Sequence, residues 1–305
     1  MIIVLGSVNM DLVVSVKGAP AGGETVSATG WFMNAGGKGA NQAVQAALLG
    51  ARVFFVGRVG SDAFGTELVK QMASRGVDTT GIAVDAHEPT GVASIIVEEG
   101  GQNRIVIVPG ANAAVGEDEL EVLRRSIGAG DTLLLQGEVP FDIVQRAAAV
   151  GHSAGARVLL DPAPAASIDV ASGMLADVDI VTPNETEAGA LTGRSGIVAA
   201  AEALLALGAR TVIVKRGAEG IYVRGAIDVG NVPGFVVQAV DTTAAGDSFQ
   251  GALATALDRA MDPVEALRYA QAAAALKVTR WGAQQGMPDE DDVQQFLAAS
   301  GSVSG

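Results

Sequence analysis

The sequence predicts an α/β fold in three layers, a mainly parallel β-sheet with helices on both faces, together with a small antiparallel β lid. Short apolar runs alternate with longer amphipathic runs, which predicts parallel strands connected by covering helices. Two stretches, about 11–33 and 90–110, interrupt this order with strand-type alternation. We therefore expect one domain over residues 1–305, with a lid formed by these two inserted segments.

The N-terminal half begins with the apolar run 2–5, which ends at a Gly-Ser pair and predicts a buried strand. Strand patterns at 12–16 and 26–32 surround a Pro-Ala-Gly-Gly turn, and those at 92–98 and 103–108 flank a Glu-Gly-Gly-Gln turn at 99–102 that predicts a hairpin. The other predicted strands of this half lie at 52–59, 131–136, 156–160 and 178–182. Amphipathic patterns predict helices at 40–49, 64–75, 117–127 and 141–150.

The C-terminal half continues the alternation. Helices are predicted at 185–192, 197–207, 245–259, 263–278 and 289–299, and strands at 211–215, 220–224, 226–230 and 235–238. In open α/β sheets, ligands bind beyond the carboxyl ends of the strands. Polar residues follow several predicted strands there, namely Asn9, Asp11, Glu138, Asp161, Asn184 and Lys215. This placement predicts a site at that edge of the sheet.

Composition excludes several classes of protein. No Cys is present, which excludes disulfides, thiol catalysis and Cys-ligated zinc and favours the cytoplasm. The net charge of −14 disfavours nucleic acid and anionic membranes as partners. The N-terminus lacks the pattern of a signal peptide, and no apolar run is long enough to predict a transmembrane helix. His87 and His152 show no metal-binding spacing and are expected at the surface.

A glycine-rich segment at 34–42 (Asn-Ala-Gly-Gly-Lys-Gly-Ala-Asn-Gln) opens the first predicted helix. It is not a Walker A loop, because Gly39 follows Lys38, and Gln42 replaces the last Gly of a dinucleotide motif. The segment is either a flexible turn or a close approach of the backbone to a polar ligand at a helix N-terminus. In the second case, the amide of Asn41 has a free donor and a free acceptor, which suit adjacent sugar hydroxyls.

A second segment at 241–249 (Asp-Thr-Thr-Ala-Ala-Gly-Asp-Ser-Phe) precedes a long apolar helix. Small residues there leave the first N–H groups of the helix open, and such an end stabilises an anion. Asp247 is either a capping residue or a base beside an amide nest, the arrangement that phosphoryl transfer needs. We expect Asp247 to be ionised at neutral pH because the helix N-terminus favours its charge.

Two more segments have both a structural and a functional interpretation. At 184–187 (Asn-Glu-Thr-Glu), ordinary capping is favoured when the segment is taken alone, and a hydrated Mg²⁺ held by Asn184 and Glu187 is the alternative. At 215–220 (Lys-Arg-Gly-Ala-Glu-Gly), the choice is between a hairpin turn and a loop against a nucleotide.

Taken together, these segments resemble the ribokinase-like family of sugar and nucleoside kinases. The matching motifs run nearly end to end, at 6–11, 20–25, 36–43, 161–165, 182–187, 240–247 and 279–284. The Asp-Thr-x-Ala-Ala-Gly-Asp motif marks the wide family, and Gly-Gly-Lys-Gly-Ala-Asn-Gln marks its ribose-specific branch. The resemblance implies transfer of the ATP γ-phosphoryl group to O5 of D-ribose, with Mg²⁺ and a monovalent cation, usually K⁺.

The resemblance also assigns roles to residues. Asp247 is implied as the base, with the amides of Ala244, Ala245 and Gly246 beside it in an anion hole. The implied sugar-binding residues are Asn9, Asp11, Gly37, Lys38, Asn41, Glu138 and Asp247. Those implied for ATP are Asn184, Lys215, Arg216, Gly217, Ala218, Glu219, Gly220, Gly246 and Gln271, and Asn184 and Glu187 would organise Mg²⁺ through water. The monovalent cation is implied at Asp241, Thr243, Lys277, Arg280, Gly282 and Gly286, several through backbone carbonyls.

This chain departs from the family pattern at three positions. It has Gly286 where the family often has Ser, Gln271 where it often has His or Asn, and Lys215 where Thr is common. A kinase for deoxyribose, a ketohexose or a nucleoside stays open as an alternative. A non-catalytic sugar-binding protein would be expected to lose Asp247 or Gly246, and both are present.

The resemblance further implies a homodimer in which two lids contact each other across a two-fold axis. Candidates for the face over the sugar or against the partner lid are Val14, Val16, Trp31, Met33, Ile95 and Val97. The alternative is a monomer whose lid covers only its own site.

Overall fold

The computed structural model describes residues 1–100 and 102–301. Over these residues the body contains a nine-stranded sheet in the order β13-β12-β11-β10-β9-β8-β1-β4-β5. From β11 to β5 all neighbouring strands are parallel, whereas β12 and β13 add antiparallel pairings at one edge. The strands are β1 (Ile2–Leu5), β4 (Val53–Gly60), β5 (Val77–Asp85), β8 (Thr132–Gln136), β9 (Arg157–Asp161), β10 (Ile180–Val181), β11 (Thr211–Lys215), β12 (Ile221–Gly225) and β13 (Gly230–Val232).

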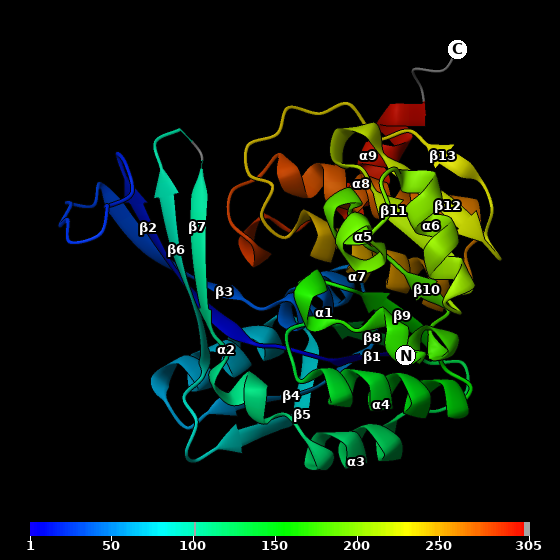
Figure 1. Cartoon of the computed structure of the whole chain (residues 1–305), viewed down its shortest axis with the longest axis horizontal. Helices are drawn as coiled ribbons and strands as arrows, with labels where there is room; N and C mark the ends of the chain where they lie inside the picture. The colour runs from blue at the N-terminus through cyan, green and yellow to red at the C-terminus, as the bar shows by residue number, and fades with distance from the viewer. Residues whose placement is uncertain (101, 302–305) are drawn as a thin grey trace.

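Helices cover both faces of this sheet (Figure 1). The first face carries α1 (Lys38–Leu48), α2 (Ala63–Ser74), α7 (Ala245–Asp258), α8 (Pro263–Val278) and α9 (Glu290–Gly301). The opposite face carries α3 (Glu117–Ser126), α4 (Phe141–Ser153), α5 (Glu185–Thr192) and α6 (Ile197–Ala206). Strand β1 shows why the sheet is buried on both sides: Ile2 and Val4 join the first core, and Ile3 and Leu5 join the second. The predicted three-layer α/β fold is therefore confirmed.

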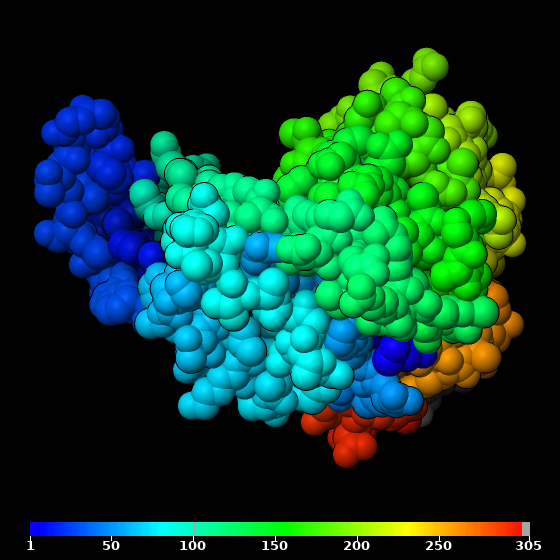
Figure 2. All heavy atoms as spheres, turned by 90° about the horizontal axis from the view of Figure 1, so that it is seen from below, coloured from blue at the N-terminus to red at the C-terminus, as the bar shows by residue number. Residues whose placement is uncertain are grey.

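The lid is a separate four-stranded sheet in the order β3-β2-β6-β7, with β2 (Asn9–Val16), β3 (Gly30–Gly36), β6 (Gly91–Glu98) and β7 (Asn103–Val108). The outer pairings are antiparallel, and the central pair β2–β6 is parallel. The sheet stands away from the body in Figure 1, and in Figure 2 the surface is hollowed between the lid, in blue and teal, and the green part of the body. The hairpin predicted around 99–102 joins β6 to β7, but residue 101 of its turn lies outside the described residues.

Most of the remaining connections are short turns. The 3₁₀ turns are η1 (Gly110–Ala114), η2 (Ala165–Ser167), η3 (Val170–Ser172), η4 (Met174–Asp177), η5 (Gly217–Glu219) and η6 (Gln284–Gly286). Within the described part of the chain, no helix combines the length and apolarity needed to cross a membrane.

Three strand predictions need correction, and one strand was not predicted. Strand β5 was missed because it lies at the edge of the sheet, where Asp78 and Thr80 face solvent and hide the apolar pattern. The apolar run 235–238 is not a strand: it has no pairing partner, and it lines a cavity instead. The strand predicted at 226–230 is found at Gly230–Val232, and the one predicted at 26–32 begins only at Gly30.

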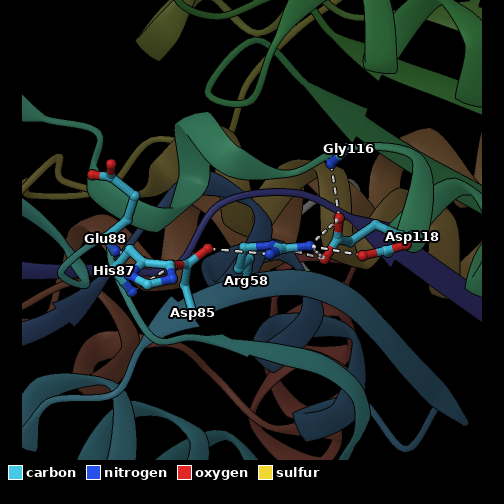
Figure 3. Close-up of polar contacts among 7 residues, drawn as sticks. Arg58, Asp85, His87, Glu88, Gly116 and Asp118 are labelled. Carbon is cyan, nitrogen blue, oxygen red and sulfur yellow. Dashed lines mark hydrogen bonds and ion pairs between the residues drawn. The ribbon is translucent and has the colours of Figure 1, made fainter.

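An ion-pair cluster centred on Arg58 ties β4 to β5 and α3 (Figure 3). The guanidinium donates to Asp85 at 3.1 Å and to Glu119 at 3.0 and 3.2 Å. Glu119 is buried and also accepts the Gly116 N–H at 2.7 Å, so its charge is fully paired. His87, drawn beside this cluster, is exposed, as is His152, so both histidines lie at the surface as expected.

Candidate active site

A cavity of about 600 Å³ lies beyond the carboxyl ends of β10 and β11, next to the first turn of α7. The expected site residues that line it are Lys38, Asn184, Glu187, Lys215, Gly217, Ala218, Gly220, Ala244, Ala245, Gly246, Asp247 and Gln271. Arg216 and Glu219, which were also assigned to ATP, do not line the cavity. They form an ion pair with each other, and the Arg216 guanidinium lies 3.8 Å from Glu185. The parallel strand order therefore gathers segments that are far apart in the sequence around one cavity.

Helix α7 begins after an unusual backbone turn at Ala244. Its φ of 58° and ψ of 17° are left-handed, a conformation that residues other than glycine rarely adopt. The N–H of Ala245 donates to the Thr242 carbonyl at 3.2 Å. For the N–H groups of Gly246 and Asp247, no acceptor exists within residues 1–100 and 102–301. These two open amides at the positive end of the helix can bind an anionic oxygen.

Asp247 lies in the first turn of α7 and is only 5 % exposed. Its carboxylate accepts the Asn41 amide N–H at 2.9 Å and that of Gln42 at 3.2 Å. Burial raises the pKa of Asp247, whereas Lys38 and the Asn41 hydrogen bond act in the opposite direction. The expected effect of the helix N-terminus on the charge is thus opposed by burial, and a raised pKa brings the carboxylate closer to the pH at which a general base operates.

The amide of Asn41 is not free, contrary to expectation. It donates to Asp247, and its oxygen accepts the Gln284 amide at 3.1 Å. The side chain therefore connects the base to the 3₁₀ turn η6 and fixes the position of the carboxylate.

A buried polar chain behind Asp247 was not assigned from the sequence. Gln42 donates to both Asp247 and Asp161 at 3.2 Å and accepts from Gln136 at 2.8 Å. Asp161 in turn accepts the Lys215 ammonium at 2.8 Å. The available signal was position: Asp161 ends β9, Gln136 ends β8, and Gln42 lies one residue after Asn41.

Glycine at the start of α1 permits the close packing on which the site depends. Gly37 has a φ of 88°, and a Cβ there would lie 2.8 Å from the Ser7 carbonyl oxygen. A Cβ on Gly36 would lie 2.3 Å from the Asp11 carboxylate. The glycine-rich segment is thus a close-packed backbone between β1 and the lid strands, not a flexible turn.

The other polar residues assigned to the sugar lie between this segment and the lid. Asn9 is buried and accepts the Asn112 amide at 2.7 Å. Glu138 accepts the Lys38 backbone N–H at 2.9 Å. Burial, with the nearby carboxylates of Glu138 and then Asp247, raises the pKa of Asp11 to about 7. The site therefore collects carboxylates on the side that faces the lid.

The Lys38 ammonium interacts electrostatically with four carboxylates of the site. Burial lowers its pKa, but the carboxylates of Asp247, Asp161, Glu138 and Glu187 outweigh burial and raise it. Lys38 therefore stays charged in the cavity, where it can meet a phosphate oxygen.

The segment 184–187, which also borders the cavity, forms a capping box. Asn184 accepts the Glu187 N–H at 2.8 Å, and Glu187 accepts the Asn184 N–H at 2.7 Å. The capping interpretation therefore describes the geometry, and both side chains also line the cavity. Within the residues described, no cluster of three His, Asp or Glu side chains is positioned to hold a metal ion.

Gln271 lies deeper in the cavity, on α8. Its amide nitrogen donates to the carbonyls of Val232 and Pro233 at 3.2 and 3.3 Å. Its amide oxygen is buried and has no partner in the described structure. This orphaned acceptor can take an N–H from a bound ligand.

The expected cation ligands surround the carboxylate of Asp241, at the start of the loop that leads to α7. The N–H groups of Thr243 and Gly282 each donate to this carboxylate at 2.9 Å. The Lys277 ammonium donates to the backbone carbonyls of Asp241 at 2.9 Å and Arg280 at 3.3 Å. Two of the residues assigned to a monovalent ion thus already have their backbone carbonyls bonded to an ammonium group.

Comparison with known proteins identifies the family of this chain. The sequence profile of the pfkB family carbohydrate kinases matches residues 1–290. A ribokinase from Haemophilus influenzae is 42 % identical over 96 % of this chain and 97 % of its own. The crystal structure of a Thermotoga maritima ribokinase superimposes with a TM-score of 0.89 at 40 % identity, over 97 % of this chain and 99 % of that one.

An Arabidopsis thaliana ribokinase, solved in complex with ribose and ATP, gives a TM-score of 0.83 at 36 % identity, over 97 % of this chain and 98 % of that one. A family profile that covers nearly the whole chain and relatives that match it end to end leave one conclusion. This chain belongs to the pfkB family of carbohydrate kinases.

Proposed function

We propose that this protein transfers the γ-phosphoryl group of ATP to the O5 hydroxyl of D-ribose. The observation that carries the proposal is the buried carboxylate of Asp247 beside the open amides of Gly246 and Asp247, at one end of a cavity of about 600 Å³. A base and an anion-binding helix end at one point are the groups that phosphoryl transfer needs. The ribokinases matched over nearly the full chain support ribose as the sugar.

The sugar would bind between the glycine-rich segment and the lid. In this proposal Asp11 and Asn41 contact ring hydroxyls, with Asn9 and Glu138 at the sides and the Gly37–Lys38 backbone below. Asn41 already donates to Asp247, so a bound hydroxyl would share or replace that bond and come close to the base. This coupling would place the O5 hydroxyl within proton-transfer reach of Asp247.

ATP would occupy the cavity between the 217–220 loop, residues 234–239 and α8. The unpaired amide oxygen of Gln271 suits the exocyclic amino group of adenine. Phe235 and Val237 add apolar surface beside it. The phosphates would then extend toward Lys215 and the first turn of α7. Arg216 and Glu219 would act indirectly, by fixing this loop.

Mg²⁺ would bind with ATP rather than in a preformed protein site. Asn184 and Glu187 offer oxygen atoms at the cavity wall, the donor type that Mg²⁺ prefers, and they would bind it through water. When bound, Mg²⁺ would neutralise charge on the β- and γ-phosphates.

In the proposed reaction, Asp247 takes the proton of the O5 hydroxyl as that oxygen attacks the γ-phosphorus. The bond between the γ-phosphorus and the β,γ-bridging oxygen breaks, and ADP leaves with that bond's electron pair. The open amides of Gly246 and Asp247 donate to the phosphoryl oxygens as their charge redistributes. Lys38 and Lys215 both line the cavity at this helix start: the carboxylates of Asp247 and Glu187 act on Lys38, and a Cβ on Gly246 would lie 3.3 Å from the Lys215 ammonium. No covalent enzyme intermediate is needed.

The lid is proposed to close over the sugar and to form a homodimer contact. Strand register separates its two faces: Asp11, Val13 and Ile95 share the face toward the site, and Leu12 and Val14 share the opposite face. The six candidate lid residues therefore divide, with Ile95 and Val97 on the site face and Val14, Val16, Trp31 and Met33 on the other. We also propose that the chain forms one domain with the lid attached to it, and that the protein is located in the cytoplasm.

The outer face of the lid is the better candidate for the dimer contact. Trp31 and Val106 lie on it and are 67 % and 65 % exposed. Apolar side chains exposed at this level on a small projecting sheet gain stability when a second copy covers them.

The proposal is tested by following ADP release with ribose, 2-deoxyribose, fructose and adenosine as acceptors, and by assigning the product with ³¹P NMR. Ribose should give the highest kcat/KM and a phosphomonoester at O5. A higher kcat/KM with another acceptor would transfer the assignment to that sugar or nucleoside. ATP turnover that no acceptor stimulates would contradict kinase function altogether.

A further inference from the structure

The environment of Lys277 conflicts with a bound monovalent cation. Lys277 lies in the last turn of α8 and is 0 % exposed. Its ammonium donates to the carbonyl oxygens of Asp241 and Arg280, at 2.9 and 3.3 Å. Both residues belong to the set that the family resemblance assigns to K⁺.

An ammonium and a K⁺ ion cannot share these oxygens. Both are compact unit cations that carbonyl oxygens bind, and at van der Waals contact in a buried place they would repel strongly. The Lys277 ammonium lies 2.9 Å from the Asp241 carbonyl oxygen, so the negative charge of Asp241 already has a cationic neighbour.

One of the departures from the family pattern, Gly286, lies beside the Arg280 carbonyl that Lys277 also contacts. A Cβ on Gly286 would lie 2.9 Å from the Trp281 carbonyl oxygen and 3.1 Å from that of Arg280. A serine at this position would therefore crowd an oxygen that Lys277 uses, and glycine avoids that contact while it supplies no hydroxyl ligand. Lys277 thus places a positive charge where the ion would bind, and Gly286 lacks the hydroxyl that would be a ligand of the ion.

We propose that the Lys277 ammonium is a built-in replacement for the monovalent cation, so that this kinase does not need K⁺. Lys277 acts as a positioning residue. Its bond holds Asp241, the Asp241 carboxylate holds the Thr243 N–H, and the next residue, Ala244, adopts the left-handed turn that opens the amides of α7. The inference rests on the proposed role of these amides as the anion hole.

The first experiment uses the wild-type protein. Melting temperature and ATP affinity by calorimetry are measured in KCl and in tetramethylammonium chloride at equal ionic strength, with ATP as its Tris salt to exclude Na⁺. Both quantities, and the kcat for ribose, should be the same in the two salts. A saturable rise of melting temperature and ATP affinity with K⁺ alone would overturn the proposal.

The second experiment compares variants. Lys277→Ala opens the carbonyls, so we expect about a 10²-fold lower kcat in tetramethylammonium, with recovery and a saturable rise in melting temperature when K⁺ is added. Lys277→Met fills the space without a charge and should lose activity that K⁺ does not restore. Lys70→Ala, which removes an exposed lysine on α2, is the control and should respond to neither salt.

The outcomes separate the two proposals. Lys277→Ala with wild-type kcat and stability in tetramethylammonium would show that Lys277 has no positioning role. Failure of Lys277→Ala to fold in tetramethylammonium, with folding in K⁺, would support it. If the wild-type protein does not phosphorylate ribose in either salt, the proposed function fails, while the melting-temperature comparison still tests whether the cation is built in.

Discussion

Asp247→Asn is the most direct test of the catalytic assignment, and the structure shows that this substitution also affects stability. The two carboxylate oxygens accept amide N–H groups from Asn41 and Gln42. An asparagine amide has one acceptor oxygen, so its NH₂ group must face one of these donors. We therefore expect loss of one buried hydrogen bond, about 1–3 kcal/mol of stability, together with loss of the base.

Removal of the base is expected to lower kcat by about 10²–10⁴-fold. A matched variant separates this effect from the lost hydrogen bond. It combines Asn41→Asp with Asp247→Asn, so that the amide introduced on α7 can donate to the carboxylate introduced on α1, while Gln284 and Gln42 retain their acceptors. The exchange keeps the total charge and restores the hydrogen-bond pattern, but it moves the carboxylate away from Gly246.

The assay measures kcat by ADP release and stability by thermal melting. The single variant should lose both activity and stability, and the exchanged variant should regain stability but not kcat. If the exchanged variant recovers kcat, the position of the carboxylate does not matter and Asp247 is not the base. Near-normal kcat in Asp247→Asn would refute the assignment directly.

Four further predictions concern other parts of the site and the lid. The pKa of Asp11 is raised to about 7 from 3.8, so the folded protein keeps a proton that the unfolded chain loses, and stability should fall as pH rises through that window. Asp11→Asn should remove this decline between pH ~4 and ~7 in calorimetric melts. An equal dependence of stability on pH in the variant and the wild-type protein would contradict the prediction. Asp11→Ala should weaken ribose binding by about one to two decades, whereas unchanged affinity in calorimetry would exclude a sugar contact. Lys215→Met leaves buried Asp161 without its closest cation, so we expect about 3 kcal/mol lower unfolding free energy and a higher KM for ATP, and an unaltered denaturation midpoint would count against the pair. Val106→Asp, on the outer lid face, should reduce the mass measured by light scattering to that of one chain. Ile105→Asp, on the site face, should weaken ribose binding and leave the mass unchanged. A wild-type protein with the mass of one chain and full activity would contradict the dimer proposal.

The fold was predictable wherever a strand is buried on both faces or a helix has one apolar side. Strands β1, β8 and β11 are continuous apolar runs because helices cover both of their faces, and their limits were predicted within one residue. Edge elements were less predictable. Strand β5 shows little apolar pattern because solvent covers one side, and the run 235–238 is apolar because it lines a cavity.

The site was predictable at positions where a strand end or a helix start fixes the backbone. Asp247 and the segment 184–187 follow from local sequence and lie where expected. The bonds between segments could not be predicted, since Asn41 and Gln42 reach Asp247 across about 200 positions of sequence. The same limit applies to Lys277: its sequence position agreed with the cation set, and only its side-chain direction shows that the ammonium lies on the carbonyls.

The distribution of charge explains how a chain with a net charge of −14 can bind a triphosphate. Four carboxylates act on the ammonium of Lys38 and raise its pKa, and the ammonium of Lys215 is bonded to Asp161, so nearby negative charge already offsets both cations before the nucleotide binds. A bare triphosphate would add negative charge to a region that already has more carboxylates than ammonium groups, and it would be repelled. The nucleotide must therefore bring its own neutralisation, which Mg²⁺ would provide under the proposed function. The open amides at the start of α7 supply donors that no neighbouring carboxylate has neutralised. It follows that the affinity for ATP should depend on Mg²⁺ more steeply than in a site with free lysines. It also follows that the amides, whose geometry depends on the Asp241–Lys277 contact, carry the part of phosphate recognition that the lysines cannot supply.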